Sequence, residues 1–333
     1  MGVTGPVHLD VDITGKVAIE GVLHTQVTVH LPDPAARRDP PVVVFAFPGG
    51  GASRGMYCME APTTLAYSQA RWHAERGIVF VSCDHLGTGG SSHPDPASLS
   101  TPYPLAWANE ATVHGVLGLL ETGALVPGHP RLRDPVVLGI GHSMGANLTI
   151  VLQAHRETFA GIGVLGYSAI HTALPHPPGI DPRPPRRQPR LHPPEGRDVS
   201  APGAHDRAVR RYMNRWDAEE AAEVKRHEWE IPLASRTMPP AARFMNAAGV
   251  VTEEASWIEV PVFLGFGERD VTRNPWEEPR YYWRSRDVTL AVIPRMSHGM
   301  NSASTRVMLW RRLQHWAEGV AAFAGADARE FRE

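Results

Sequence analysis

Short apolar runs recur along most of the chain, and their pattern differs between its start and its middle. Six runs are continuous rather than alternating, at 41–47, 77–84, 135–141, 160–169, 260–267 and 288–294. Continuous runs of this length are typical of strands buried on both faces of a parallel sheet. Helical stretches are expected at 59–76, 104–122, 146–157 and 302–323. Residues 7–31 alternate apolar and polar side chains, which predicts two or three antiparallel strands.

The order of these elements predicts an α/β fold with a doubly wound, mostly parallel sheet. The alternation of strands and helices stops after the sixth strand and resumes near residue 260. The interruption opens with a segment rich in proline and arginine, and continues with an amphipathic helical stretch, 204–230, and a shorter one, 241–248. We therefore expect a core formed by 1–169 and 258–333, with a helical cap inserted at 170–257.

Composition narrows the function classes. The chain has 333 residues, 42% of them hydrophobic, and a formal net charge of -2. Such a weak net charge favours neither nucleic acid nor an acidic membrane surface as a partner. The two cysteines, Cys58 and Cys83, indicate reduced thiols rather than a disulfide framework. No basic segment followed by an apolar one opens the sequence, and no apolar run approaches about 20 residues. A cytoplasmic protein is expected.

The stretch "VVLGIGHSMGANLTIVL", 136–152, carries the strongest chemical signal. A strand runs into Gly141-His142-Ser143-Met144-Gly145, and a helix leaves it. A sharp turn of this kind strains the serine and raises its hydroxyl above the sheet, beside a helix N-terminus. Glycine on each side lets strand and helix approach closely. Ser143 is therefore predicted to be a nucleophile.

A serine hydroxyl needs a base, and the base needs an acid to orient it. After a turn of this type the expected chain order is serine, acid, histidine. Asp270 follows the strand that ends in Gly265-Phe266-Gly267, and His298 follows the last strand. Both lie at the carboxyl ends of strands, where open α/β sheets place their sites. We therefore predict Asp270 as the acid, with Glu268 as its competitor, and His298 as the base.

Other polar residues compete for these roles. The chain has 17 histidines. His142 stands on the wrong side of the turn and is expected to pack or to hydrogen-bond locally, and His85 and His114 lack the right placement. Asp84, which precedes "HLGTGGSS", is expected to brace that glycine turn through backbone hydrogen bonds.

Two backbone N–H groups are expected to hold a developing oxyanion. One belongs to Met144, directly after the nucleophile. The other is predicted in "FPGGGAS", 47–53, at Gly50 or alternatively Gly51. That loop lacks the lysine and hydroxyl residue that end a phosphate-binding loop. No cysteine or histidine spacing indicates a metal site, and no cofactor is expected.

In these motifs the chain resembles the α/β-hydrolase superfamily. The resemblance rests on "FPGGG", "CDHLGTGGSS", "GHSMG", "FGERD" and "MSHGM", in family order. One departure is Pro48-Gly49, where members usually carry His-Gly. Members with a cap after strand six match the position of 170–257. Epoxide hydrolases and haloalkane dehalogenases of this fold carry aspartate at the position of Ser143, so a serine there argues against both.

The resemblance implies a serine hydrolase that cleaves a carboxylic ester or lactone through an acyl-enzyme. Aromatic and sulfur-containing side chains of the cap favour a bulky apolar substrate, such as a macrocyclic lactone. The candidate substrate contacts are Tyr212, Met213, Trp216 and Phe244. The alternatives are acyl transfer or carbon–carbon bond hydrolysis on the same triad, and a non-catalytic ligand-binding protein of this fold. The oligomeric state is not indicated, and a homo-oligomer is compatible with the sequence.

Overall fold

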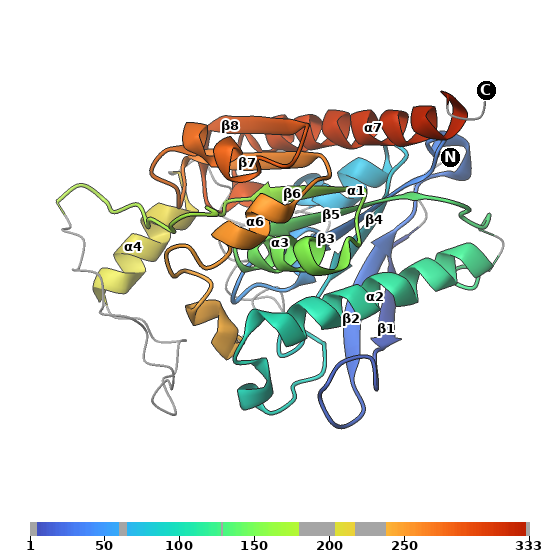
Figure 1. Cartoon of the computed structure of the whole chain (residues 1–333), viewed down its shortest axis with the longest axis horizontal. Helices are drawn as coiled ribbons and strands as arrows, with labels where there is room; N and C mark the ends of the chain where they lie inside the picture. Colours follow the sequence, from blue (N-terminus) through green and yellow to red (C-terminus); the bar gives the residue numbers. More distant parts are fainter. Residues whose placement is uncertain (1–4, 60–64, 128, 180–203, 217–237, 331–333) are drawn as a thin grey trace.

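Eight strands form a single sheet in the computed structural model of the chain, which describes residues 5–59, 65–127, 129–179, 204–216 and 238–330 (Figure 1). The strand order is β1-β2-β4-β3-β5-β6-β7-β8. Their bounds are β1 Val7–Asp12, β2 His24–His30, β3 Val42–Phe47, β4 Val79–Cys83, β5 Val136–His142, β6 Gly161–Leu165, β7 Val262–Arg269 and β8 Val288–Ser297.

The sheet is antiparallel only at the end formed by β1 and β2. β2 pairs antiparallel with both β1 and β4, and the neighbouring pairs from β4 to β8 are parallel. All six residues of β3 and all five of β4 are buried, as expected of strands covered on both faces. The predicted doubly wound, mostly parallel sheet is confirmed.

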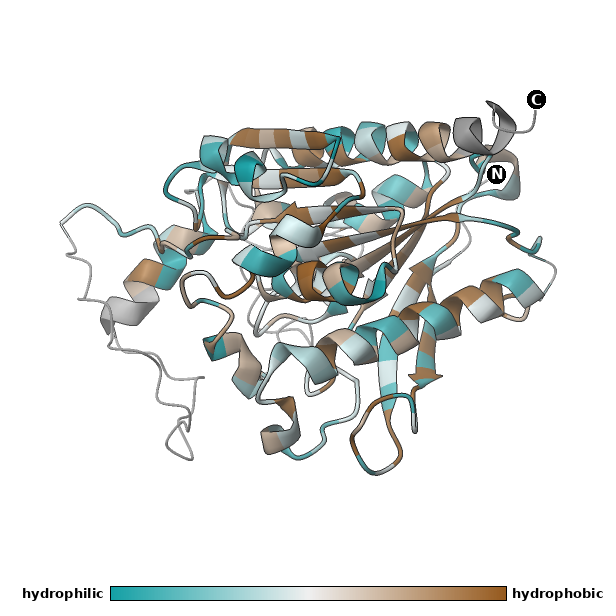
Figure 2. Ribbon diagram, viewed as in Figure 1, coloured by the Kyte–Doolittle hydropathy of each residue, from teal (hydrophilic) through white to brown (hydrophobic). Residues whose placement is uncertain are grey.

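Helices cover both faces of the sheet (Figure 1). One face carries α2, α3 and α6, with α3 packed against the other two, and the other face carries α1 and α7. The α-helices are α1 Gln69–Ala74, α2 Pro102–Thr122, α3 Met144–Arg156, α4 Ala204–Asn214, α6 Thr252–Trp257 and α7 Arg306–Glu330. Figure 2 shows hydrophobic residues concentrated in the strands, whereas α2 and α7 alternate hydrophobic and hydrophilic residues. None of the helices in the described ranges is long and apolar enough to cross a membrane.

Two predicted helices begin later in the structure than expected. Within 59–76, α1 begins only after Ser68, whose hydroxyl accepts a hydrogen bond from the Arg71 N–H at 3.3 Å and so caps the helix. A 3₁₀ turn, Leu65–Tyr67, precedes it, and 60–64 lie outside the described residues. At the carboxyl end, the 3₁₀ turn Met300–Ser302 delays the start of α7.

The helix predicted at 241–248 is wrong. Only a 3₁₀ turn, Pro240–Arg243, forms there. The Met245 carbonyl, which a helix would offer to the Gly249 N–H, accepts instead from the Tyr167 hydroxyl at 2.6 Å. The Gly249 N–H donates to the Ile170 carbonyl at 2.7 Å. Contacts with the core therefore replace the helical pattern.

The segment 170–257, predicted as the cap, lies between β6 and β7. Its described parts are 170–179, 204–216 and 238–257. The proline- and arginine-rich stretch and most of the predicted helix beyond 216 lie outside the described residues. The division at 170 and 257 stays a prediction.

Candidate active site

The predicted site residues gather where strands end. β3, β4, β5, β7 and β8 end at Phe47, Cys83, His142, Arg269 and Ser297. The glycine loop, Asp84, Ser143, Asp270 and His298 follow these strands directly. Because these strands run parallel, all five segments lie at one edge of the sheet, the edge at which open α/β sheets bind ligands.

Ser143 occupies a strained turn between β5 and α3. Its backbone has φ 52° and ψ -115°, a region that residues with a side chain rarely adopt. The turn depends on its glycines, because a Cβ on Gly141 would overlap the Gly145 backbone and a Cβ on Gly145 would overlap the Phe47 carbonyl. The Ser143 N–H donates to the Leu165 carbonyl at 2.9 Å, which ties the turn to β6.

Asp270 and His298 form a buried hydrogen-bonded pair. His298 Nδ1 lies 2.7 Å from Asp270 Oδ1, and His298 and Asp270 are 6% and 7% exposed. Asp270 also accepts from the N–H groups of Gly267 at 2.9 Å and Val271 at 2.8 Å. An ionised carboxylate held this way keeps the Nδ1 proton in place, which leaves Nε2 of His298 for proton transfer.

The competing acid, Glu268, lies elsewhere. Its side chain is exposed and accepts a hydrogen bond from the Arg295 N–H at 2.8 Å. In a regular strand, residues two positions apart point to the same face, but β7 carries an irregularity between Gly267 and Arg269. The irregularity breaks this relation, and Asp270 rather than Glu268 reaches His298.

His142 supports His298 through its main chain. The His142 Nε2–H donates to the His298 carbonyl at 2.8 Å, and the two ring centroids are 4.5 Å apart. Burial lowers the pKa of His142 to about 3, so the ring is neutral near neutral pH. The neutral ring packs and hydrogen-bonds locally, in agreement with the sequence-based expectation.

The structure brings the serine and the histidine to neighbouring positions without a hydrogen bond between them. The Ser143 N–H binds the Leu165 carbonyl, and the residue after Leu165, Gly166, is so close to His298 that a Cβ there would lie 2.9 Å from Nδ1. Within the described part of the chain, the Ser143 hydroxyl makes no hydrogen bond. Catalytic hydrogen bonds are often loose without substrate and tighten when it binds.

The glycine loop after β3 lies against the nucleophile. A Cβ on Gly49 would be 3.3 Å from the Cβ of Ser143. Gly50, the predicted oxyanion donor, is flanked by the Met144 and Met238 sulfurs, which would lie 3.6 and 3.4 Å from a Cβ on this glycine. Gly51 adopts φ 78°, which favours glycine. Sequence reasoning missed Met238, because no pattern indicates that this residue, 188 positions after Gly50, returns to the loop.

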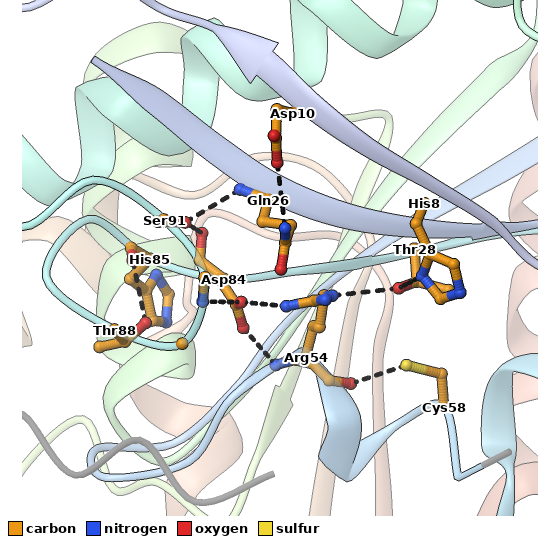
Figure 3. Close-up of polar contacts among 12 residues, drawn as sticks. His8, Asp10, Gln26, Thr28, Arg54, Cys58, Asp84, His85, Thr88 and Ser91 are labelled. Atoms are coloured by element: carbon orange, nitrogen blue, oxygen red, sulfur yellow. Dashed lines mark hydrogen bonds and ion pairs between the residues drawn. The ribbon is translucent and has the colours of Figure 1, made fainter. Parts of the chain in front are cut away.

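A buried ion pair holds the end of this loop (Figure 3). The Arg54 guanidinium pairs with Asp84 and donates to the Thr28 hydroxyl at 3.1 Å. Asp84, which is fully buried, also accepts from the N–H groups of Arg54 at 2.6 Å and Gly90 at 2.9 Å. The carboxylate thus braces the glycine turn after β4, as predicted, and it also fixes the chain just beyond the glycine loop.

His85 holds the start of the same loop. Its Nε2 lies 3.0 Å from the Pro48 carbonyl, and Nδ1 lies 3.2 Å from the Asn109 side-chain amide. Burial lowers the pKa of His85, which favours the neutral ring. A neutral His85 that donates from Nε2 anchors Pro48 directly before the three glycines. Its role is structural, and it lies apart from the Asp270–His298 pair.

The four candidate substrate contacts lie in different settings. The rings of Tyr212 and Trp216 flank the Arg269 guanidinium, 3.8 and 4.7 Å from its central carbon. The Met213 carbonyl accepts from the His298 N–H at 2.9 Å. Phe244 is half-buried at the end of the 3₁₀ turn Pro240–Arg243. Three of the four are thus next to the Asp270 and His298 loops.

A cavity of about 490 Å³ lies at the other edge of the sheet and contains none of the predicted catalytic residues. It is lined by residues of the α3 end, the α6 end and the start of β7, among them Phe159, Trp257 and Val260. No group of three or more potential metal-binding side chains occurs within the described ranges.

Comparison with known proteins agrees with this geometry. The model of the Alpha/beta hydrolase family matches residues 43–308. No protein of curated function matches the sequence significantly.

Several solved structures share the fold at low sequence identity. A thermostable carboxyl esterase from Bacillus coagulans is 16% identical, with a TM-score of 0.60 and coverage of 96% of this chain and 99% of the esterase. Proline iminopeptidase from Mycobacterium smegmatis is 16% identical, with a TM-score of 0.57 and coverage of 95% and 100%. A haloalkane dehalogenase variant from Bradyrhizobium elkanii is 12% identical, with a TM-score of 0.57 and coverage of 97% and 99%.

Proposed function

The chain belongs to the alpha/beta hydrolase family, and from that premise we propose that it is a serine hydrolase that cleaves a carboxylic ester or lactone. Esterases, peptidases and dehalogenases share this fold, so the fold alone does not choose the reaction. The choice depends on the residues at the carboxyl ends of the strands.

One observation carries the proposal. A serine in a strained backbone conformation stands at the β5–α3 turn, at the same edge as a buried Asp270–His298 hydrogen bond of 2.7 Å. Strain of this kind is retained where function needs it. Serine, rather than a carboxylate, at this turn favours attack on an acyl carbon.

In the proposed mechanism, the Ser143 oxygen attacks the carbonyl carbon while His298 Nε2 takes the hydroxyl proton. Asp270 stabilises the imidazolium that forms. The N–H groups of Met144 and Gly50 hold the oxyanion. Collapse of the tetrahedral intermediate breaks the bond to the leaving alcohol, which takes the proton from His298. A water molecule activated by His298 then releases the acid and restores Ser143.

The proposed substrate is bulky and apolar. The support is the set of apolar side chains around the reacting centre: Met144 and Met238 flank Gly50, and the Tyr212 and Trp216 rings lie beside the histidine loop. Thioether and aromatic side chains adapt to large apolar groups. A macrocyclic lactone belongs to this class, and its single ester bond would open without loss of a second fragment.

Acid release measured by pH-stat tests the proposal across acyclic esters and small and macrocyclic lactones. Wild type and Ser143→Ala are compared, and circular dichroism verifies that both are folded. We expect turnover by the wild type and a loss of at least about 10³-fold in Ser143→Ala. Equal turnover by both proteins would exclude Ser143 as the nucleophile.

Product analysis on the same panel, with a diketone added, separates the alternative chemistries. Acyl transfer would deliver the acyl group to an added alcohol in place of water, and carbon–carbon hydrolysis would act on a diketone rather than on the esters. Tight binding of a panel member without turnover would favour a ligand-binding role and would count against hydrolysis.

A further inference from the structure

The end of α4 faces the two loops that carry Asp270 and His298. The Met213 carbonyl accepts from the His298 N–H at 2.9 Å, and the Arg215 carbonyl accepts from the Arg269 guanidinium. Between them, the Asn214 carbonyl is so close to Gly299 that a Cβ there would overlap it. Three consecutive carbonyls therefore meet His298 itself, the glycine after it and the arginine before the acid.

Arg269 holds this junction together. Its guanidinium lies between two rings, 3.8 Å from the Tyr212 centroid and 4.7 Å from the Trp216 centroid. The same Nη2 that donates to Arg215 also donates to the Ser297 hydroxyl at 3.0 Å. Arginine suits such a site because its planar cation can stack on rings and donate in its own plane at once. One side chain thus links β7, β8 and the end of α4.

The position of His298 depends on three contacts. Its ring donates to Asp270, its carbonyl accepts from His142, and its N–H donates to Met213. Asp270 lies in the loop after β7, and His142 is the last residue of β5. The third partner belongs to α4, far away in sequence, and the stack of Arg269 on two rings and its hydrogen bond to the Arg215 carbonyl tie the end of α4 to β7.

We propose that Arg269 is a positioning residue for the reaction: by clamping the end of α4 it holds the Met213 carbonyl on the His298 main chain and so keeps the imidazole aligned with Ser143. This inference deepens the proposed function and rests on it. A displacement of about 1 Å in a reacting group can cost about 100-fold in rate. Loss of the clamp should therefore lower kcat, whereas a residue that only anchors a surface segment would alter stability or KM.

The test compares Arg269→Met with Arg269→Lys and with a matched control, Arg76→Met. Arg76 stacks on Trp72 with the same 3.8 Å separation and donates to the Trp72 carbonyl, far from the triad. The probe is p-nitrophenyl acetate, whose acyl group is too small to need cap contacts. We expect Arg269→Met to lower kcat by about 10–100-fold with KM within about threefold, partial rescue by lysine, and wild-type kcat in the control.

Unchanged kcat in Arg269→Met, with only a lower Tm or a higher KM, would overturn the proposal. Should that variant not fold, Tyr212→Leu removes one ring of the clamp and is held to the same kcat criterion.

A second readout needs no turnover. The Nδ1 proton shared with Asp270 should give a far-downfield proton resonance in the wild type, and Arg269→Met should shift or broaden it while Arg76→Met does not. An identical resonance in all three proteins would overturn the positioning role. If the wild type hydrolyses neither p-nitrophenyl acetate nor any ester or lactone of the panel, the proposed function fails, and this resonance still decides whether Arg269 aligns His298.

Discussion

Two arginines, Arg54 and Arg269, hold opposite sides of the site by different chemistry. Arg54 secures the glycine loop through a buried carboxylate: the side chain of Asp84 is 0% exposed and that of Arg54 is 20% exposed (Figure 3). Arg269 secures the histidine loop through two aromatic faces, a hydroxyl and a carbonyl. Among the described residues, no carboxylate pairs with Arg269.

The difference concerns where each partner comes from. Asp84 follows β4, which is the direct neighbour of β3, so the sheet itself delivers the partner of Arg54. Arg269 has one partner in the sheet, Ser297 at the end of β8, and three from a segment outside it: Tyr212, Arg215 and Trp216. The glycine loop is thus fixed by the core, whereas the histidine loop also depends on α4. We expect changes in α4 to affect the histidine loop and to leave the glycine loop unaltered.

The largest effect is expected on the histidine side, at Asp270. Asp270→Asn keeps the shape of the side chain but removes the charge that holds the Nδ1 proton of His298, and kcat should fall by about 10⁴-fold. Glu268→Gln is the matched control, because Glu268 is exposed and contacts the Arg295 N–H. Steady-state kinetics on one ester compare the kcat values of the two variants. Comparable losses in both variants would contradict the assignment of the acid.

On the glycine-loop side, Gly50→Pro removes the predicted oxyanion donor and should lower kcat by about 10²–10³-fold. Gly50→Ala retains the N–H, and its Cβ would make only ordinary contacts, with the nearest atom the Met238 sulfur at 3.4 Å. Alanine should therefore keep most of the activity. Unchanged kcat in Gly50→Pro would contradict Gly50 as the donor.

Stability compares the two arginines directly. Asp84→Ala leaves the partly buried Arg54 cation and the Gly90 N–H without their carboxylate and should lower the free energy of unfolding by about 3 kcal/mol. Arg269→Met loses a stack on two rings and should cost about 1–2 kcal/mol. Urea unfolding followed by circular dichroism measures both. A larger loss in Arg269→Met would reverse the comparison, and would identify α4 as the stronger support.

The last prediction concerns the pH dependence of the free energy of unfolding. Burial lowers the pKa of His142 to about 3, below its ordinary value of 6.5, so between these values the unfolded chain binds a proton that the folded protein does not. The free energy of unfolding therefore falls as pH drops below about 6.5. His142→Gln should flatten this dependence by up to about 1.4 kcal/mol per pH unit. Equal slopes in both proteins, from urea unfolding at a series of pH values, would contradict the neutral buried ring.

The sheet and its site-bearing strands could be predicted because their signals are local. Continuous apolar runs mark β3 to β8, and the glycines on both sides of Ser143 avoid overlaps of Gly141 with the Gly145 backbone and of Gly145 with the Phe47 carbonyl. Chain order and strand ends were enough to predict that Asp270 and His298 would share an edge with Ser143. Asp84 was predicted to brace its own glycine turn for the same reason.

The remaining features depend on contacts between distant segments. Arg54 as the partner of Asp84, and Met238 beside Gly50, follow only from the folded arrangement. The helix expected at 241–248 is absent because Tyr167, some eighty positions earlier, takes the carbonyl that the helix would use. Likewise, no periodicity in α4 indicates that its last carbonyls meet His298.

The most direct test of the central claim is the intact mass of the protein after reaction with a small fluorophosphonate, followed by peptide mapping. This reagent reports an activated serine whatever the natural substrate is. We predict one adduct per chain, located on Ser143, with none in Ser143→Ala and much slower labelling in His298→Gln. An adduct elsewhere, or labelling of Ser143→Ala at the wild-type rate, would contradict a nucleophile at this turn activated by His298 and Asp270.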